Sequence, residues 1–194
     1  MPKSFKQTPS QTVGPFFAYG LTPRQYGYNF GEIASSQLTK SDTKGERISI
    51  IGKLYDGTGT PMANAVIEIW QADSEGNYAP LYTKDKFFGY GRVGTGTDPE
   101  NRFVIETIKP GRVDDQQAPH IALIIMSRGI MQHVYTRLYF SDEAEANAKD
   151  PVLNALPAER KTTLIAERKQ NEDRTEYHFD IYMQGENETV FLEF

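Results

Sequence analysis

Hydrophobic and polar positions alternate along much of the chain from Arg47 onward. In the clearest example, Ile48, Ile50 and Leu54 lie on one face of an extended segment, which ends at an Asp-Gly-Thr-Gly turn over 56–59. Such alternation followed by a tight turn is typical of short antiparallel strands. Similar patterns predict strands over 66–70, 103–108, 120–126, 131–140, 177–183 and 189–194. The chain is therefore predicted to be all-β, with six or seven strands forming a sandwich.

Two segments depart from this alternation. Residues 141–169 are rich in Ala, Glu, Lys and Arg, and Pro157 suits a helix start, so we expect one or two short surface helices there. Residues 1–46 show little periodicity but carry many aromatic side chains. We expect an irregular N-terminal arm that either wraps the chain's own sandwich or crosses to a partner. The chain is then one domain over 1–194, with an arm over 1–46 and a sandwich over 47–194 that holds the helical insertion at about 141–169.

Composition excludes several classes of protein. The 194 residues include no cysteine, which rules out disulfides, iron–sulfur clusters and cysteine-bound zinc. The 21 basic and 26 acidic residues give a net charge of −5, which disfavours binding to nucleic acid or to an anionic membrane. The longest apolar run, over 121–126, is far shorter than the roughly 20 residues of a membrane-spanning helix. The polar N-terminal residues do not resemble a secretory signal, so we expect a cytoplasmic protein.

The histidines offer few catalytic or metal-binding arrangements. They lie at positions 120, 133 and 178, and none pairs with another at a metal-ligand spacing. A partner for His120 on the same strand face would stand at position 122, which is alanine. From the residues alone, His120 is most simply interpreted as a structural histidine at the start of the most apolar strand.

Two other motifs have a functional and a structural interpretation. Arg128-Gly129 lies at a turn between two predicted strands, where a guanidinium can meet a carboxylate; an ordinary solvated arginine is the alternative. The run over 89–94 fits Gly-x-Gly-x-x-Gly, but no strand-to-helix context follows it, so we do not expect a dinucleotide site. Without further comparison, the residues indicate only a soluble all-β domain.

Seven strings, taken in order, resemble the intradiol ring-cleavage dioxygenases, and the resemblance covers nearly the whole chain. They are TPSQTVGP at 8–15, EIWQAD at 68–73, IKPG at 108–111, APHI at 118–121, RG at 128–129, TRLYF at 136–140 and QGENETVF at 184–191. The resemblance implies an intradiol-dioxygenase-like β-sandwich.

The resemblance also implies where an iron site would lie. In that family, two tyrosines and two histidines hold non-haem Fe(III). Tyr78 and His120 stand at the first tyrosine and first histidine positions, whereas Val113 and Ala122 stand at the other two, and neither has a lone pair to offer. Gln117 replaces an arginine expected three residues before the first histidine. We therefore expect no metal and no catalytic residue in this chain, only four remnant positions.

With two of the four ligands lost, the chain resembles a non-catalytic member of the family that pairs with a related, iron-bearing beta chain and forms part of the wall of its active site. The resemblance implies that Arg128 approaches the carboxylate of a bound dihydroxybenzoate and that Thr12, Gly14, Pro15 and Phe16 line the substrate entrance. A tyrosine is common at the position of Phe16, so no hydrogen bond is expected there. In the assembly, Fe(III) of the beta chain would support insertion of both atoms of O₂ between the adjacent ring hydroxyls.

Two alternatives stay open on the sequence, and a third is disfavoured. The chain could serve a related dioxygenase that acts on another substituted catechol, or it could be a sandwich that binds partners without any enzymatic role. A self-sufficient intradiol enzyme is disfavoured, because such enzymes need all four ligands and usually carry an N-terminal helical dimerisation segment that residues 1–46 do not resemble.

Overall fold

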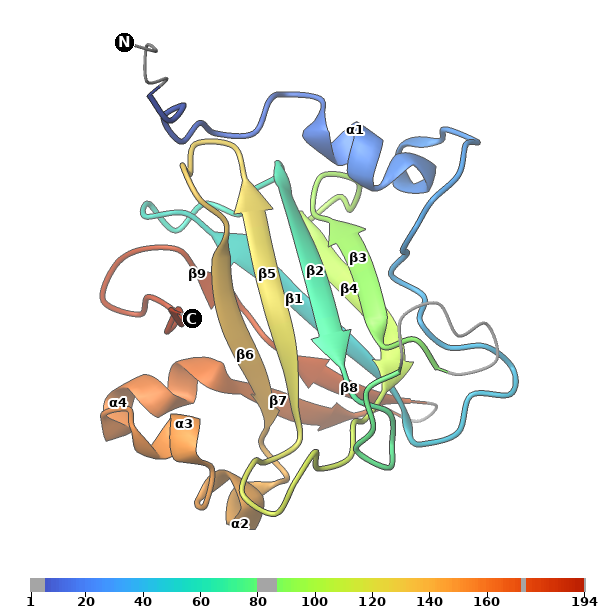
Figure 1. The fold of residues 1–194 in the computed structure, drawn as a ribbon, viewed down its shortest axis with the longest axis vertical. Helices are drawn as coiled ribbons and strands as arrows, with labels where there is room; N and C mark the ends of the chain where they lie inside the picture. The colour runs from blue at the N-terminus through green and yellow to red at the C-terminus, as the bar shows by residue number, and fades with distance from the viewer. Residues whose placement is uncertain (1–5, 80–86, 172–173, 194) are drawn as a thin grey trace, which may run out of the picture.

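The computed structural model describes residues 6–79, 87–171 and 174–193 (Figure 1). Its strands are β1 (Arg47–Tyr55), β2 (Ala65–Gln71), β3 (Tyr90–Gly94), β4 (Arg102–Ile108), β5 (His120–Ser127), β6 (Val134–Phe140), β7 (Ile165–Gln170), β8 (Thr175–His178) and β9 (Ile181–Tyr182). Its α-helices are α1 (Phe17–Leu21), α2 (Ala144–Asn147), α3 (Pro151–Asn154) and α4 (Ala158–Lys161), and its 3-10 helices are η1 (Pro23–Tyr26) and η2 (Thr162–Leu164). Within the described ranges, no helix has the length and apolar character needed to cross a bilayer.

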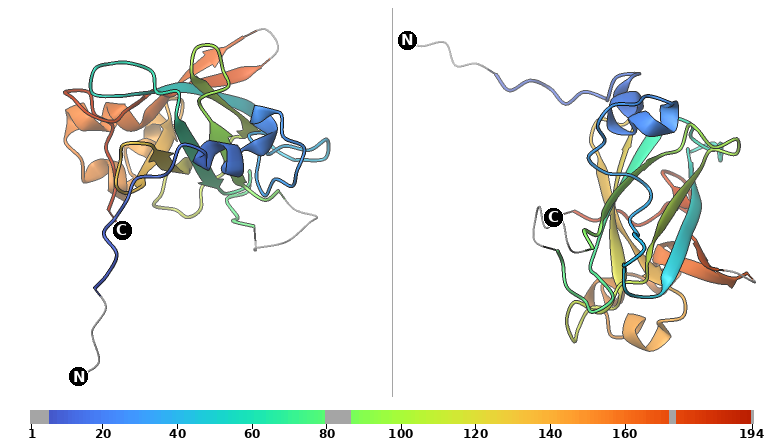
Figure 2. Two further views of the ribbon diagram at one scale, coloured as in Figure 1. Left: turned by 90° about the horizontal axis from the view of Figure 1, so that it is seen from above. Right: turned by 90° about the vertical axis from the view of Figure 1, so that its right-hand side faces the viewer.

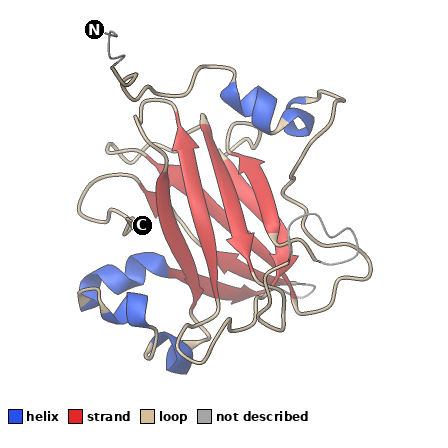
Figure 3. Ribbon diagram, viewed as in Figure 1, coloured by secondary structure: helices blue, strands red, loops and turns tan. Residues whose placement is uncertain are grey.

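One sheet bends over itself to make two layers. The strands pair in the order β3-β2-β5-β6-β7-β8-β1-β4, and β9 joins β1. The bend falls at β7, which pairs with β6 through its first residues and with β8 through its last. As a result β1 and β4 lie behind β2 and β5, and the views from two directions show the same layering (Figures 1 and 2). The prediction of an all-β sandwich is confirmed (Figure 3).

The core lies between the two layers. Alternation along β1 turns Ile48, Ile50 and Leu54 inward, where they meet Ile105 of β4 and Ile67 of β2. All five side chains are at most 2% exposed. Burying one such side chain stabilises the fold by roughly 1.5–3 kcal/mol, so the period-2 pattern is what holds the layers together.

Some strand boundaries differ from the prediction. β3 was not predicted, because Gly89 to Gly94 lacks the apolar alternation that marks a strand. It is an edge strand, and among the described strands it pairs with β2 alone. The segment 177–183 splits into β8 and β9 around Asp180, whose Oδ1 accepts from the Lys53 backbone N–H at 2.8 Å. The strand predicted over 189–194 is wrong for its described part, which makes a single bridge between Leu192 and Tyr135; Phe194 lies outside the described residues.

The helical insertion is shorter than predicted and contains more helices. It holds three four-residue α-helices and η2, all ending by Leu164. Asp150 begins α3 by accepting hydrogen bonds from the N–H groups of Val152 and Leu153, as an N-cap should. The expected helix over 165–169 is wrong, because Ile165 and Ala166 pair with β6 in parallel and tertiary pairing overrides helix propensity. Parallel pairing requires a crossover connection, and the insertion supplies it.

The N-terminal arm has two parts with different surroundings. Residues 17–38 contact the chain's own sandwich: the Ser35 carbonyl accepts from Arg92 of β3, and Leu38 N–H donates to Glu106 of β4. This part therefore bridges the two end strands of the open sheet. Residues 6–16 are exposed apart from half-buried Val13. The first of them extend away from the sandwich (Figure 2), whereas Thr12 contacts the turn after β5 through Gly129.

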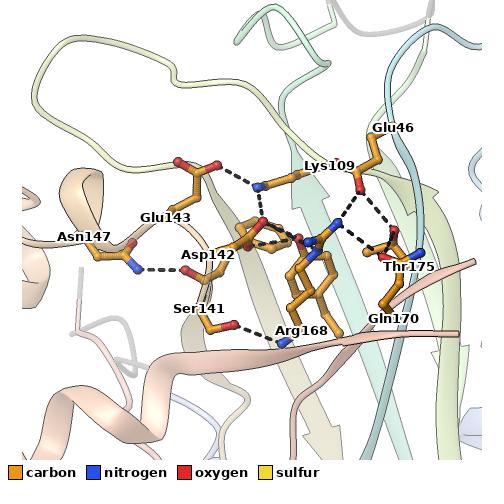
Figure 4. A network of polar contacts seen from close by, with 11 residues as sticks. Glu46, Lys109, Ser141, Asp142, Glu143, Asn147, Arg168, Gln170 and Thr175 are labelled. Carbon is orange, nitrogen blue, oxygen red and sulfur yellow. Dashed lines mark hydrogen bonds and ion pairs between the residues drawn. The ribbon is translucent and has the colours of Figure 1, made fainter.

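A network of charged and polar side chains ties the insertion to the sandwich (Figure 4). Lys109, at the end of β4, lies 2.8 Å from Asp142 and 2.7 Å from Glu143, in the loop before α2. The Tyr177 hydroxyl of β8 donates to both oxygens of Asp142 at 3.0 Å. The Lys109 side chain is only 14% exposed, so its two ion pairs are screened less than surface pairs.

Replacing Lys109 tests the strength of this network. Lys109→Met keeps the apolar stem but removes the cation from Glu143 and leaves Asp142 with Arg168, whose Nε lies 3.7 Å away. We therefore expect the free energy of unfolding of the full chain to fall by about 1–3 kcal/mol in urea denaturation. Lys169→Met is the control, since Lys169 is half exposed and 3.9 Å from Glu167; its effect should stay below about 0.5 kcal/mol. Equal effects of the two variants would contradict the role given to Lys109.

The same network predicts a loss of stability in alkali. Burial, helped by the hydrogen bond to Asp142, raises the pKa of Tyr177 from 10.0 to about 12. The folded state therefore favours the neutral phenol, and this contribution is complete below the unfolded pKa of 10.0 and is lost as pH rises toward about 12. We expect Tyr177→Phe to flatten the fall of unfolding free energy across this range. Tyr28→Phe, at an exposed ring, should not; identical slopes in both variants would refute the assignment.

Candidate functional site

Close contact between two loops brings the predicted remnant positions Tyr78 and Val113 into one region. Tyr78 follows β2 and Val113 follows β4. Gly76 has a φ of +84°, and a Cβ on it would lie 1.9 Å from the Arg112 carbonyl oxygen, so only glycine fits. From the other side, the Gly111 N–H donates to the Asp73 carbonyl at 2.8 Å. The glycines in the two loops thus permit the backbone approach that places Tyr78 near Val113.

The start of β5 supplies the other two remnant positions. Ala122 pairs with Trp70 of β2, and the Tyr78 ring stacks on Trp70 with centroids 5.8 Å apart and planes 4° from parallel. His120 is 4% exposed, and its Nδ1 donates to the Ala118 carbonyl at 2.8 Å. Burial lowers the pKa of His120, so the ring is neutral at pH 7 and its Nε2 keeps a lone pair.

Arg137 of β6 is a residue of this region to which sequence reasoning gave no role. It pairs with Ala122 across the strands, and its Nη1 donates to Gln117 Oε1 at 3.1 Å and to the Tyr139 hydroxyl at 3.4 Å. Burial raises the pKa of Tyr78, and the charge of Arg137 opposes that rise. Gln117 is the sequence feature that could have indicated Arg137. Because arginine is expected at position 117, its absence suggests that a neighbouring strand supplies the guanidinium.

The donor set at these positions does not fit iron. Tyr78 and His120 offer a phenol oxygen and an imidazole nitrogen, but the Val113 and Ala122 side chains have no atom that can coordinate a metal. No group of three or more His, Asp or Glu side chains suited to a metal ion occurs among the described residues. That this chain holds no metal therefore stays a prediction, and it rests on the chemistry of these side chains.

The predicted substrate-contacting residues lie at the opposite end of β5. Thr12 Oγ1 accepts from the Gly129 N–H at 2.8 Å, which joins the arm to the turn that carries Arg128. The Arg128 side chain is exposed. Gly14, Pro15 and Phe16 continue the arm into α1, where the Gly14 carbonyl accepts from the Phe17 N–H at 3.3 Å. Phe16 is 75% exposed, so its ring faces out of this chain.

The structure therefore separates the two groups of predicted residues. His120 begins β5 and Arg128 follows its last residue, and a strand of this length at about 3.4 Å per residue puts them roughly 25 Å apart. In Figure 1 the arm and α1 lie at the carboxyl end of β5, whereas the loop that leads into β5 lies at the other end. Within one chain, Arg128 and the arm are therefore too far from the remnant positions to contact a molecule bound there.

A cavity of about 300 Å³ opens elsewhere, beside β8 and β9. Its lining includes Thr162, Ile165, His178, Asp180 and Tyr182. His178 Nε2 is 3.2 Å from Glu176 Oε2, a local pair along one strand. None of the predicted site residues lines this cavity.

Comparison with known proteins identifies the family. The family model described as Dioxygenase matches residues 22–185. A solved structure of an intradiol ring-cleavage dioxygenase from Tetranychus urticae superposes with a TM-score of 0.60 at 20% identity, covering 80% of this chain and 88% of that one, which shows the common fold. The chain therefore belongs to the intradiol ring-cleavage dioxygenase family, as its sequence motifs predict.

Within this family the chain is similar over its whole length to one kind of subunit. It is 48% identical to the protocatechuate 3,4-dioxygenase alpha chain of Burkholderia cepacia, over 98% of both chains. It is 42% identical to the alpha chain of Pseudomonas putida, over 97% of this chain and 96% of that one. The beta chain of Burkholderia cepacia is 29% identical over 81% of this chain and 73% of its own length. The resemblance of the individual chain is therefore to the alpha chains of protocatechuate 3,4-dioxygenase.

Proposed function

We propose that this chain is the alpha subunit of a protocatechuate 3,4-dioxygenase that acts in the cytoplasm. In this role it has no iron site of its own and completes the active site of an iron-bearing beta subunit. The assembled enzyme cleaves protocatechuate with O₂ between its two hydroxyls to give 3-carboxy-cis,cis-muconate. The isolated chain is inactive.

The observation that carries this proposal is the separation along β5. The positions that would bind iron keep two donors of four, while Arg128 and the arm residues stand exposed at the far end of the same strand. Exposed residues of this kind can contact a substrate only in a site that another chain completes. The similarity to alpha chains over the whole length supports the same assignment.

Arg128 supplies the chemistry that an aromatic carboxylate requires. A guanidinium offers a planar fork of donors that binds a carboxylate through two hydrogen bonds. Its backbone is held on both sides, because the Arg128 N–H donates to the Asn64 carbonyl at 3.4 Å and the Gly129 N–H donates to Thr12. The turn therefore presents the guanidinium from a fixed base, and a bound dihydroxybenzoate would orient its carboxylate toward it.

The arm residues wall the substrate entrance in this proposal. Gly14 has nothing within 4 Å of the place where a Cβ would lie, so a partner's backbone or a ligand can approach it closely. Pro15 restricts the bend, and the Phe16 ring shields the site from water without offering a hydroxyl. Fe(III), the cofactor of intradiol dioxygenases, is bound by the beta subunit, which supplies the oxygen chemistry.

Exposed apolar side chains on the arm mark the surface for the beta subunit. Phe16, Tyr28, Phe30 and Ile33 are 75%, 48%, 55% and 86% exposed. Aromatic rings also follow one another along this part of the chain, with Tyr28 and Phe30 centroids 5.6 Å apart. Several large apolar groups left in water on one short segment are typical of a protein–protein interface.

Arg128→Ala in the co-expressed enzyme tests the substrate contact. We expect a higher KM for protocatechuate with a smaller effect on kcat, equivalent to a loss of about 1–3 kcal/mol for a charge-assisted pair. Arg128→Lys keeps the charge without the fork and should raise KM less. Steady-state oxygen uptake gives both constants, and unchanged KM and kcat in Arg128→Ala would refute the contact.

Deletion of residues 1–17 tests the role of the arm. The deletion removes the Thr12 contact and the exposed Phe16 but leaves the core residues in place. We expect weaker association with the beta subunit in sedimentation experiments, with an unchanged circular dichroism spectrum of the chain alone. Phe16→Ala should weaken association less than the deletion. A truncated chain that still forms the complex at full strength would show that the arm does not hold the partner.

A further inference from the structure

The hydrogen bond between Thr12 and Gly129 joins the start of the N-terminal arm to the turn that carries Arg128. Residues 6–16 are exposed apart from half-buried Val13, and their other hydrogen bonds stay within the arm. Across the part of the chain that the structure describes, only the bond from the Gly129 N–H to Thr12 Oγ1, at 2.8 Å, connects these residues to the sandwich by hydrogen bonding. The place of the arm beside the turn therefore depends on Thr12.

The Arg128 side chain has no partner that could fix its orientation. It is exposed, and over the described ranges 6–79, 87–171 and 174–193 no hydrogen bond or ion pair reaches its guanidinium. Arginine has many rotamers, and the freedom that it loses when a ligand binds opposes binding. A long side chain of this kind is directed by its backbone, so the contacts on either side of Arg128 decide where the guanidinium can reach.

The backbone of this turn is held by the sheet on one side and by the arm on the other. Ser127 is 1% exposed and donates to the Asn64 carbonyl at 3.0 Å, and the Arg128 N–H donates to the same carbonyl at 3.4 Å. Gly129 has a φ of +92°, which residues with a side chain rarely adopt, and in this conformation its N–H meets the Thr12 hydroxyl. Loss of the Thr12 contact would therefore release one side of the turn while the other stays held.

We propose that Thr12 is a positioning residue, whose hydroxyl acts through the Gly129 N–H to hold the turn so that Arg128 meets the substrate carboxylate. This inference rests on the proposed function, in which Arg128 binds that carboxylate. It gives Thr12 an indirect role in place of the substrate-lining role that the family resemblance implies. The arm and the turn then act as one unit of the site.

Two substitutions of Thr12 in the co-expressed enzyme separate the hydroxyl from the shape of the side chain. Thr12→Val keeps the branching but cannot accept a hydrogen bond, whereas Thr12→Ser keeps the hydroxyl. We expect Thr12→Val to raise KM for protocatechuate about two- to tenfold, as loss of one hydrogen bond predicts, with a smaller change in kcat. Thr12→Ser should have a KM close to that of the unmodified enzyme. An unchanged KM in Thr12→Val would overturn the proposal.

A double-mutant cycle with Arg128→Ala distinguishes an indirect role from direct contact with the substrate. If Thr12 acts through Arg128, adding Thr12→Val to Arg128→Ala raises KM no further. The same fold increase in both backgrounds would contradict the proposal, because Thr12 would then act independently of Arg128.

Thr8→Val is the matched control for the change from hydroxyl to methyl. Thr8 is exposed on the same arm, and no hydrogen bond to it occurs within the described ranges. We expect Thr8→Val to leave KM unchanged. A rise equal to that in Thr12→Val would contradict the proposal, because any apolar change on the arm would then have the same effect.

Hydrogen exchange in the full chain alone gives a measurement that needs neither the beta subunit nor activity. By NMR, the Gly129 N–H should exchange more slowly in the unmodified chain and in Thr12→Ser than in Thr12→Val, because only the first two offer it an acceptor. Equal exchange in all three would show that the bond does not form and would overturn the proposal.

Failure of this inference is distinguishable from failure of the proposed function. A co-expressed pair that does not cleave protocatechuate refutes the proposed function, and the inference falls with it. An active pair in which Arg128→Ala raises KM and Thr12→Val does not refutes the positioning role alone.

Discussion

The pairing of β5 between β2 and β6 is the constraint on which both groups of predicted site residues depend. Its register sets Trp70 on one side of Ala122 and Arg137 on the other. The same strand ends in the turn that carries Arg128, and Thr12 joins the arm to that turn. Since a slip of one residue would turn every side chain of β5 to the opposite face, the buried Ile121, Leu123 and Ile125 fix the register and with it both ends of the strand.

The two ends of β5 have diverged in chemistry. At the amino end, two of the four predicted positions hold donors and two are apolar, and Arg137 of β6 pairs with Ala122 across the strands. At the carboxyl end, a held turn and an exposed arm offer a cation and apolar surface to the outside. This division suits a subunit that contributes to a neighbour's site, and it explains how a fold shared with iron enzymes can be retained without its metal ligands.

Much of the fold could be predicted from the sequence, and the misses have physical causes. The period-2 pattern located β1, β2, β4 and β5 because their alternate side chains enter one core. It missed β3, because a Gly-rich edge strand buries few apolar side chains. It also missed β7, whose Ala, Glu and Lys residues favour a helix, because pairing with β6 and β8 holds this segment as a strand. The motifs predicted four remnant positions. They pointed to Arg137 only indirectly, through Gln117, because its place opposite Ala122 depends on a strand register that no local pattern encodes.

The most direct test of the account measures iron content and oxygen uptake with protocatechuate, on this chain purified alone and again after co-expression with a beta chain. The account predicts an iron-free, inactive chain that becomes part of an iron-containing, oxygen-consuming complex when the beta chain is present. A chain that binds iron and cleaves the ring alone would contradict it, because the donors at Tyr78 and His120 would then suffice. Inactivity of the pair with protocatechuate would contradict the assigned substrate.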